Sequence, residues 1–135
     1  MRNIPTSNRV VFLNAAANGA GVAFPMDQFS KASFALDTSG NCAATIKFLV
    51  SNQVEEPVWT DSQSFTNQYS YAEVINFDDH ALVAGGTGVV LSGTDFHRTY
   101  GLVPQGPFRW VCAIISGYSA GVINLSVLPA TDTIS

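Results

Sequence analysis

The stretch KASFALDTSGNCAATIKFLVS, residues 31–51, carries the strongest fold signal in the chain. Apolar side chains recur at every second position in both halves, at Ala32, Phe34 and Leu36 and again at Ile46, Phe48 and Val50. A period of two is typical of a strand that buries one face. Between the halves, Ser39-Gly40-Asn41 has the composition of a turn. We therefore expect two strands joined by a short loop.

The same alternation continues outside this stretch. Two further segments place apolar residues in phase, Phe108, Trp110, Cys112 and Ile114 in one and Ile123, Leu125 and Val127 in the other. Further runs rich in Val, Phe, Tyr and Thr lie at residues 9–14, 21–26, 69–77, 87–92 and 96–102. Together with the alternating segments, they bring the count to about eight or nine short strands. Residues 76–82 fit either a helical turn or a tight hairpin corner.

These strands predict an all-β fold, an antiparallel two-sheet sandwich that is jelly-roll-like. So many short strands in a compact chain fit two layers better than an open sheet, because double layering hides strand edges. The strand phases predict that six residues share one core between the sheets: Phe34, Phe48, Trp110, Ile114, Ile123 and Leu125.

Length and patterning predict one domain with two short extensions. The chain has 135 residues, of which 47% are hydrophobic, enough to bury a core without cross-links. We place the sandwich at residues 9–128, an N-terminal arm at 1–8 and a C-terminal tail at 129–135. The extensions have little to bury in their own domain, so we expect at least one to contact another subunit. Ile4 beside Pro5 is the better candidate, because the residue before a proline is already biased toward extended backbone.

Charge is sparse, at 12% of residues with a net charge of −4. The six Lys and Arg residues are scattered rather than clustered, which argues against binding nucleic acid or a membrane surface by electrostatics. We find no apolar run long enough for a signal peptide or a membrane span, so synthesis in the cytosol is expected. When another protein covers a polar surface with few charges, few charged side chains have to be desolvated. Such a surface favours association with other proteins.

The two cysteines, Cys42 and Cys112, both lie in apolar strand-like runs. They fit either a disulfide or two small buried side chains in a reducing compartment, and the second interpretation is favoured because the core needs no cross-link. Neither has a second Cys or His at ligand spacing, so we expect no metal and no cofactor.

One motif matches an enzyme signature. Gly117-Tyr118-Ser119-Ala120-Gly121 fits the Gly-x-Ser-x-Gly nucleophile elbow of hydrolases. An elbow needs a helix after it and a histidine downstream, whereas here an alternating strand follows and contains no histidine. A turn in which glycine supplies positive φ is the better interpretation, and no catalytic residue is predicted.

The remaining polar motifs are equally weak. Asp78-Asp79-His80 fits a solvated turn better than a metal site, because adjacent loop residues seldom converge on one ion. Glu55 and Glu56 point to opposite faces if they lie on a strand, so they make a poor glycosidase pair. The run GGTG at residues 85–88 lacks the lysine and helix of a phosphate loop.

Aromatic residues near strand ends are the candidates for a contact surface. We single out Trp59, Tyr69, Tyr71 and Tyr100, which fit stacking on sugar rings, anchoring of a protein contact, or packing over the rim of the core.

Several segments together resemble a known group of proteins. They are FLNAAANGAG (12–21), Phe34, AATIKFLVSN (43–52), Trp59, PFRWV (107–111) and SGYSAGVI (116–123). In this combination the chain resembles small jelly-roll virion proteins of tailed bacteriophages, of the head-decoration or cement type. The resemblance spans residues 10–127. It departs from the group at Val54-Glu55-Glu56-Pro57, where an Asp-Gly hairpin turn is common.

The resemblance implies a non-enzymatic protein that binds and stabilises the assembled phage head. Its partners would be the major capsid protein and copies of itself, as a dimer or trimer, without nucleic acid or membrane. It would be made in the bacterial cytoplasm and end on the capsid surface. The alternative is a carbohydrate- or receptor-binding module of a phage tail or fibre, and a small hydrolase using Ser119 is a distant third.

Overall fold

The computed structural model describes residues 10–130 except for 28, 63, 65, 96 and 105–107. Within these residues the chain is all-β, with ten strands and no helix, and all strand pairs are antiparallel. In chain order the strands are β1 (Val10–Ala15), β2 (Gly19–Ala20), β3 (Phe24–Pro25), β4 (Lys31–Ser51), β5 (Ser70–Ala72), β6 (Val74–Asn76), β7 (Leu82–Val83), β8 (Val89–Ser92), β9 (His97–Leu102) and β10 (Trp110–Ala130).

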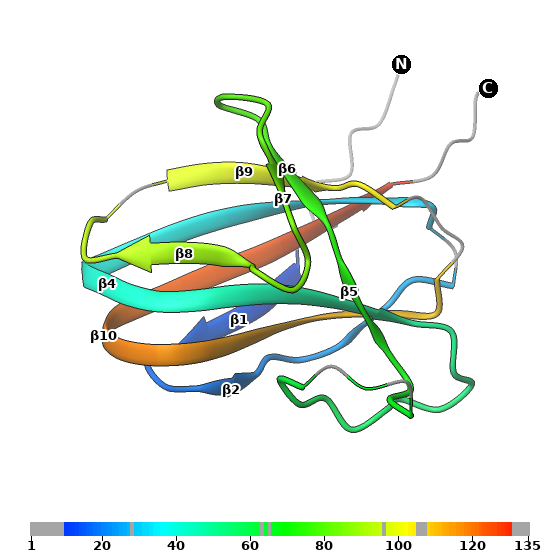
Figure 1. Cartoon of the computed structure of the whole chain (residues 1–135). Coiled ribbons are helices and arrows are strands. Elements are labelled where there is room, and N and C mark those ends of the chain that lie inside the picture. Colours follow the sequence, from blue (N-terminus) through cyan, green and yellow to red (C-terminus); the bar gives the residue numbers. More distant parts are fainter. Residues whose placement is uncertain are drawn as a thin grey trace, which may run out of the picture.

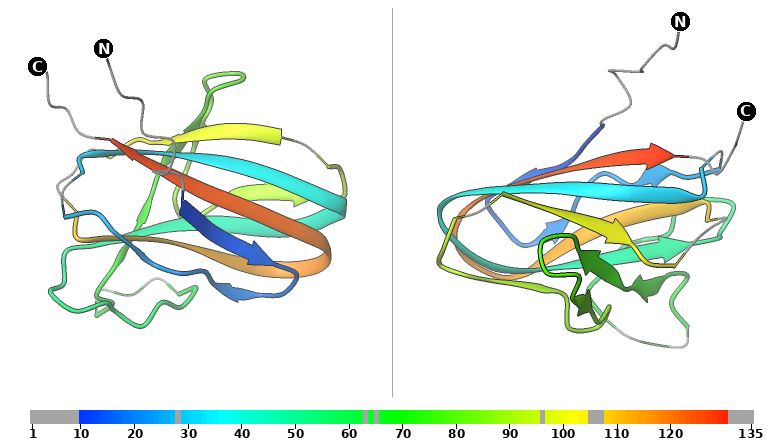
Figure 2. Two further views of the ribbon diagram at one scale, coloured as in Figure 1. Left: turned by 180° about the vertical axis from the view of Figure 1, so that it is seen from behind. Right: turned by 90° about the horizontal axis from the view of Figure 1, so that it is seen from above.

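Two long strands organise the fold. β4 and β10 have 21 residues each and pair with each other from end to end. Residues 110–116 of β10 lie opposite 45–51 of β4, and residues 122–130 lie opposite 31–39. The register shifts between these two blocks, and there the whole two-stranded ribbon folds over (Figures 1 and 2). The right-hand view of Figure 2 shows both strands curving round at the same end.

Folding the ribbon produces a two-layer sandwich. The first layer contains the early half of β4 and the late half of β10, extended by β1 on one side and by β9, β6 and β7 on the other. The second layer contains the remaining halves, extended by β2 and β3 beside β10 and by β5 and β8 beside β4. The predicted all-β antiparallel fold is confirmed, and its two layers are continuous through the folded strands.

The core lies between the layers. Phe34 from the first layer and Phe48 from the second bring their ring centroids to 4.5 Å, and both are almost fully buried. Ile123 and Leu125 join the same cluster from β10. Full burial of each such side chain stabilises the fold by about 1.5–3 kcal/mol.

The first half of β10 has the opposite phase to the one expected. Val111, Ala113 and Ile115 face the main core, whereas Ile114 belongs to a second buried cluster on the outer face. Trp110 is only partly buried, and its indole Nε1 donates a hydrogen bond to the Gln53 carbonyl oxygen at 3.1 Å. Residues 111–115 are apolar on both faces, so alternation alone could not fix which face points inward.

The two predicted turns at residues 39–41 and 116–121 lie inside strands instead of between them. They form the corner at which the ribbon passes from one layer to the other. Gly40 and Asn41 have φ values of 75° and 53°, a left-handed conformation that glycine and asparagine accept at little cost. The prediction of two strands joined by a loop is therefore wrong, because the turn residues bend one continuous strand.

The structure also shows the form of residues 76–82 and where β10 ends. Residues 76–82 form the hairpin corner between β6 and β7, closed by a hydrogen bond from the Asn76 amide to the Ala81 carbonyl at 2.9 Å. β10 runs two residues beyond the expected end of the sandwich, with Pro129 opposite Ala32. Residues 1–8, with Ile4 and Pro5, and residues 131–135 lie outside the described part of the chain.

Candidate functional site

A long segment between β4 and β5 covers part of the outer face of the second layer. On that face Leu49, Ile114 and Tyr69 form a small buried cluster, and Trp59 and Tyr71 pack against it. The figure shows this segment folding back beside β5 at the lower end of the sandwich (Figure 1). Three of the four predicted surface aromatics, Trp59, Tyr69 and Tyr71, therefore meet in one place.

Two of the four do not reach the surface: Tyr69 is 8% exposed, which corrects its expected place on a contact surface, and Tyr100 is buried more deeply. Tyr100 is 2% exposed and belongs to the main core, because β9 turns this position inward between the layers. Burial raises the pKa of its phenol above the ordinary value. The expectation that Tyr100 contributes to a contact surface is corrected.

The polar centre of this region is Asp61. Its carboxylate accepts a hydrogen bond from the Tyr71 hydroxyl at 2.6 Å and from Lys47 Nζ at 3.0 and 3.3 Å. Lys47 Nζ also lies 5.5 Å from the centroid of the Tyr71 ring. These bonds hold the pKa of Asp61 below its ordinary value, with the Tyr71 hydroxyl as the largest cause. The pKa of Tyr71 moves upward, first through burial and then through the bond to Asp61.

The aromatic rings are oriented against each other rather than side by side. The ring centroids of Trp59 and Tyr69 lie 5.6 Å apart, with an angle of 41° between the ring planes. Tyr69 meets Tyr71 edge-on, with a centroid distance of 6.5 Å and an interplanar angle of 87°. Trp59 Nε1 donates to the Glu56 carboxylate at 2.9 Å, and the Tyr69 hydroxyl contacts the Thr60 hydroxyl at 2.7 Å. Aromatic pairs prefer such tilted and edge-to-face contacts. The cluster packs the segment between β4 and β5 against the sheet. Its tilted rings do not form a flat row of ring faces.

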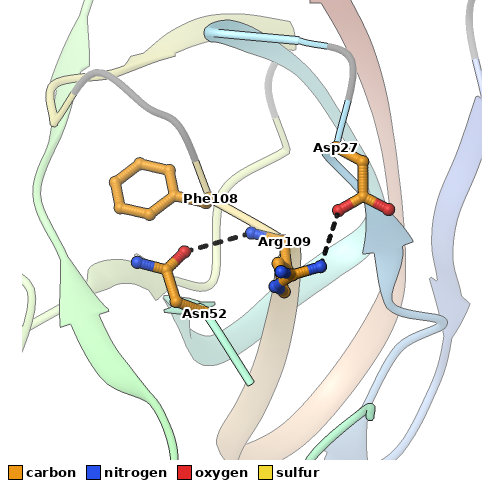
Figure 3. Close-up of a pocket in the computed structure, with 4 residues that line it drawn as sticks. All are labelled: Asp27, Asn52, Phe108 and Arg109. Atoms are coloured by element: carbon orange, nitrogen blue, oxygen red, sulfur yellow. Dashed lines mark hydrogen bonds and ion pairs between the residues drawn. The ribbon is translucent and has the colours of Figure 1, made fainter. Parts of the chain in front are cut away.

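A second candidate is a shallow pocket of about 470 Å³ lined by Asp27, Asn52, Phe108 and Arg109. Figure 3 shows Asn52 accepting a hydrogen bond from the Arg109 backbone amide, at 3.2 Å, and Arg109 Nη1 facing Asp27 at 4.0 Å. Both charged side chains are half exposed or more. The pocket presents one guanidinium, one carboxylate, one amide and one phenyl ring, a mixed set that suits contact with a polar surface. Sequence reasoning did not single out Asp27 or Asn52: Asp27 lies in no motif, and Asn52 only ends the segment AATIKFLVSN.

Two residues that an enzyme mechanism would need lie on β10 and β9. Ser119 is exposed at the corner of β10. His97 Nδ1 lies 2.5 Å from the Asp37 carboxylate on β4, and both side chains are open to solvent. The described residues contain no group of three or more His, Cys, Asp or Glu that could hold a metal ion.

The acidic motif forms a hydrogen-bonded turn. Asn76 Oδ1 accepts from the Asp78 amide, and Asp79 Oδ1 accepts from the Ala81 amide, each at 2.9 Å. Asp78 also faces the Arg98 guanidinium at 3.8 Å. The interpretation of this motif as a solvated turn matches these contacts. Elsewhere, Glu55 and Glu56 are both exposed in the segment that precedes Trp59.

Both cysteines are free and buried. Burial, with a smaller contribution from the Asp95 carboxylate, raises the pKa of the Cys42 thiol, and burial raises that of Cys112 to about 12. Of the two interpretations of these residues, the disulfide is excluded. No helix long and apolar enough to cross a bilayer occurs in the part of the chain that the structure describes.

Comparison with known proteins gives one informative result. No protein-family model matches the chain, and no curated protein sequence matches it. Among solved structures, the crystal structure of the SPBc2 prophage-derived protein YomS superposes with a TM-score of 0.65. The match covers 96% of this chain and 98% of that one, at 14% sequence identity. The two proteins therefore share a fold over almost their whole lengths.

Proposed function

We propose that this chain is a non-enzymatic structural protein of a bacteriophage particle, and that it decorates and stabilises the assembled head. The observation that carries the proposal is the fold shared with a prophage-derived protein across nearly all of both chains. Two of the phage-like motifs lie where that fold is built: residues 108–111 contain the start of β10, and residues 116–123 span the corner of the ribbon. Fold alone does not assign a role, so surface chemistry has to support it.

The surface supports a role in protein contacts. Several large apolar side chains stand in solvent, among them Val22, Val54, Val58, Leu82 and Val90, which are 60–83% exposed. Only 12% of residues are charged, so covering such a surface removes few ions from water. A subunit added to a preformed shell benefits from this property. It would stabilise the shell by mass action, because it binds the assembled lattice and not dispersed subunits.

The side chains with catalytic potential lie on β9, on the β6–β7 corner and on β10. His97 faces Asp37, Asp79 closes a turn, and Ser119 lies at the corner of β10. Acid–base or nucleophilic catalysis needs such groups to converge on one substrate position. Within the described residues no hydrogen bond links Ser119 to His97, whose partner is Asp37, and this supports a non-enzymatic role.

The geometry gives less support to the alternative, a carbohydrate-binding module. Sugar recognition by stacking needs an exposed ring face. Here Trp59 and Tyr71 pack against the outer cluster, and their polar atoms are bonded to Glu56 and Asp61. A glycan array with the intact protein tests this alternative separately.

Titration onto heads tests the proposal. Heads purified from a phage deleted for this gene should bind the purified protein saturably, with a fixed number of copies per head. Decorated heads should also withstand heating or chelation longer than bare ones. Heads that take up no protein, or take it up without saturation, would rule out decoration.

A further inference from the structure

The second layer ends in a short strand with one free side. β8 pairs with residues 43–46 of β4, and no other strand pairs with it within the described residues. The Gly93 amide donates to the Cys42 carbonyl at 2.9 Å, next to this ladder. Because hydrogen-bonding directions alternate along an antiparallel strand, Val89 and Leu91 also bond to β4. The backbone N–H and C=O groups of Val90 and Ser92 therefore point away from the sheet.

This edge has few of the features that protect strand edges. Natural edge strands are blunted by lysine, proline, inward charges or a bulge. Residues 81–94 contain no charged residue and no proline, and the β8 register against β4 is regular. Val90, beside the edge, is 63% exposed. An open row of backbone donors and acceptors selects another extended strand as its partner.

We propose that the free edge of β8 pairs antiparallel with β8 of a second copy of this chain. A register centred on Leu91 places Val90 of one copy opposite Ser92 of the other. It uses both outward residues of each copy and forms four N–H···O=C bonds about a two-fold axis. Because residues 81–94 are uncharged, the pairing opposes no like charges across the axis. The two second layers then become one continuous sheet.

The inference rests on the proposed function for its setting, since a shell brings many copies together. A four-residue strand buries little surface, so the contact is weak between free molecules. On a lattice that holds two copies side by side, the same contact becomes effectively intramolecular and is strengthened.

Val90→Pro is the decisive variant. Proline removes the outward N–H at residue 90 but leaves the bonds of Val89 and Leu91 to β4, and proline is tolerated at such edge positions. Sedimentation velocity over a concentration series should show concentration-dependent dimers for the wild type. The variant should weaken self-association by roughly tenfold or more, because it removes two of four bonds. Val90→Thr keeps the N–H and the strand preference, so it should still dimerise.

Hydrogen exchange on the wild type supplies a second readout that does not depend on how the proline variant folds. The amides of Val90 and Ser92 should exchange more slowly as concentration rises, while the amide of Val58, a residue that is 83% exposed, should not change. Exchange that ignores concentration, or dimers unaffected by Val90→Pro, would overturn the proposal. A protein that binds heads without β8 pairing keeps the proposed function and loses this inference. A protein that pairs through β8 and ignores heads does the reverse.

Discussion

Gly121 meets Cys42 so closely at the corner of the ribbon that a methyl group on Gly121 would lie 2.5 Å from the Cys42 Cα. Gly121 also has a φ of 90°, a conformation that side chains other than glycine rarely adopt. Close approach and backbone conformation thus coincide where both long strands pass from one layer to the other.

Gly121→Ala should therefore destabilise the domain strongly. Backbone strain and the clash with Cys42 add to about 2–5 kcal/mol, a large part of the stability of a domain this size. Gly93→Ala is the matched control, because Gly93 has a φ of 89° with no atom near its missing side chain. Urea unfolding of both variants should give the larger loss for Gly121→Ala. Equal losses would mean that β4 and β10 are less closely packed at this corner than described.

Core phase in β10 gives a second test. Ile115 lies in the main core and is 2% exposed. Ile115→Ala should lower the free energy of unfolding by about 2–5 kcal/mol. Trp110→Ala should cost less, because Trp110 is half-buried on the outer face and makes one hydrogen bond to Gln53. The sequence alone suggested the opposite order. Chemical denaturation decides, and a greater loss for Trp110→Ala would restore the original phase.

Acid should weaken the attachment of the segment around Asp61. The pKa of Asp61 is lowered in the folded state from its ordinary value of 3.8. A lowered folded pKa means that the carboxylate stabilises the fold above about pH 4, and that this contribution is lost as pH falls through the folded pKa. The free energy of unfolding should thus fall less for Asp61→Asn than for wild type as the solution is acidified below about pH 4.

A pH series of urea unfolding curves measures this difference. Asp27→Asn serves as the control, because that carboxylate is exposed and lies 4.0 Å from Arg109. Tyr71→Phe removes the main hydrogen-bond donor and should shift the Asp61 titration, followed by NMR, to higher pH. Identical acid slopes for wild type and Asp61→Asn would show that the carboxylate is solvated in the folded protein.

The thiols should be inert in the native state. Both are buried, and the pKa of each is raised, so little reactive thiolate is present near neutral pH. Mass spectrometry after brief iodoacetamide treatment should show almost no alkylation of native protein and two additions after denaturation. Fast labelling of native Cys42 or Cys112 would indicate that the corner or the outer face opens readily.

Sequence patterns predicted the fold better than the site. Alternation in residues 31–51 was clearer, because Ser33, Asp37, Thr45 and Lys47 interrupt the apolar residues there. From Val111 to Ile115 every residue is apolar. Alternation of polar and apolar residues therefore could not show which face of this stretch points into the core. The inward turn of Tyr100 was missed for a related reason, since its strand carries few apolar residues on either side.

The role of Asp61 had no sequence signal at all. Its partners Lys47 and Tyr71 lie 14 and 10 residues away and are brought together only by the folding of the long segment onto the sheet. Trp59, Tyr69 and Tyr71 were identifiable as a group by residue type. Their mutual orientation, which argues against a sugar platform, depends on tertiary packing.

Quantitative mass spectrometry of purified phage particles tests the proposed role most directly. Heads should be separated from tails, and the copy number of this chain measured relative to the major capsid protein. A decoration protein should be found in the head fraction at a fixed ratio to the capsid lattice. Absence from the particles, trace amounts, or confinement to the tail fraction would contradict that role.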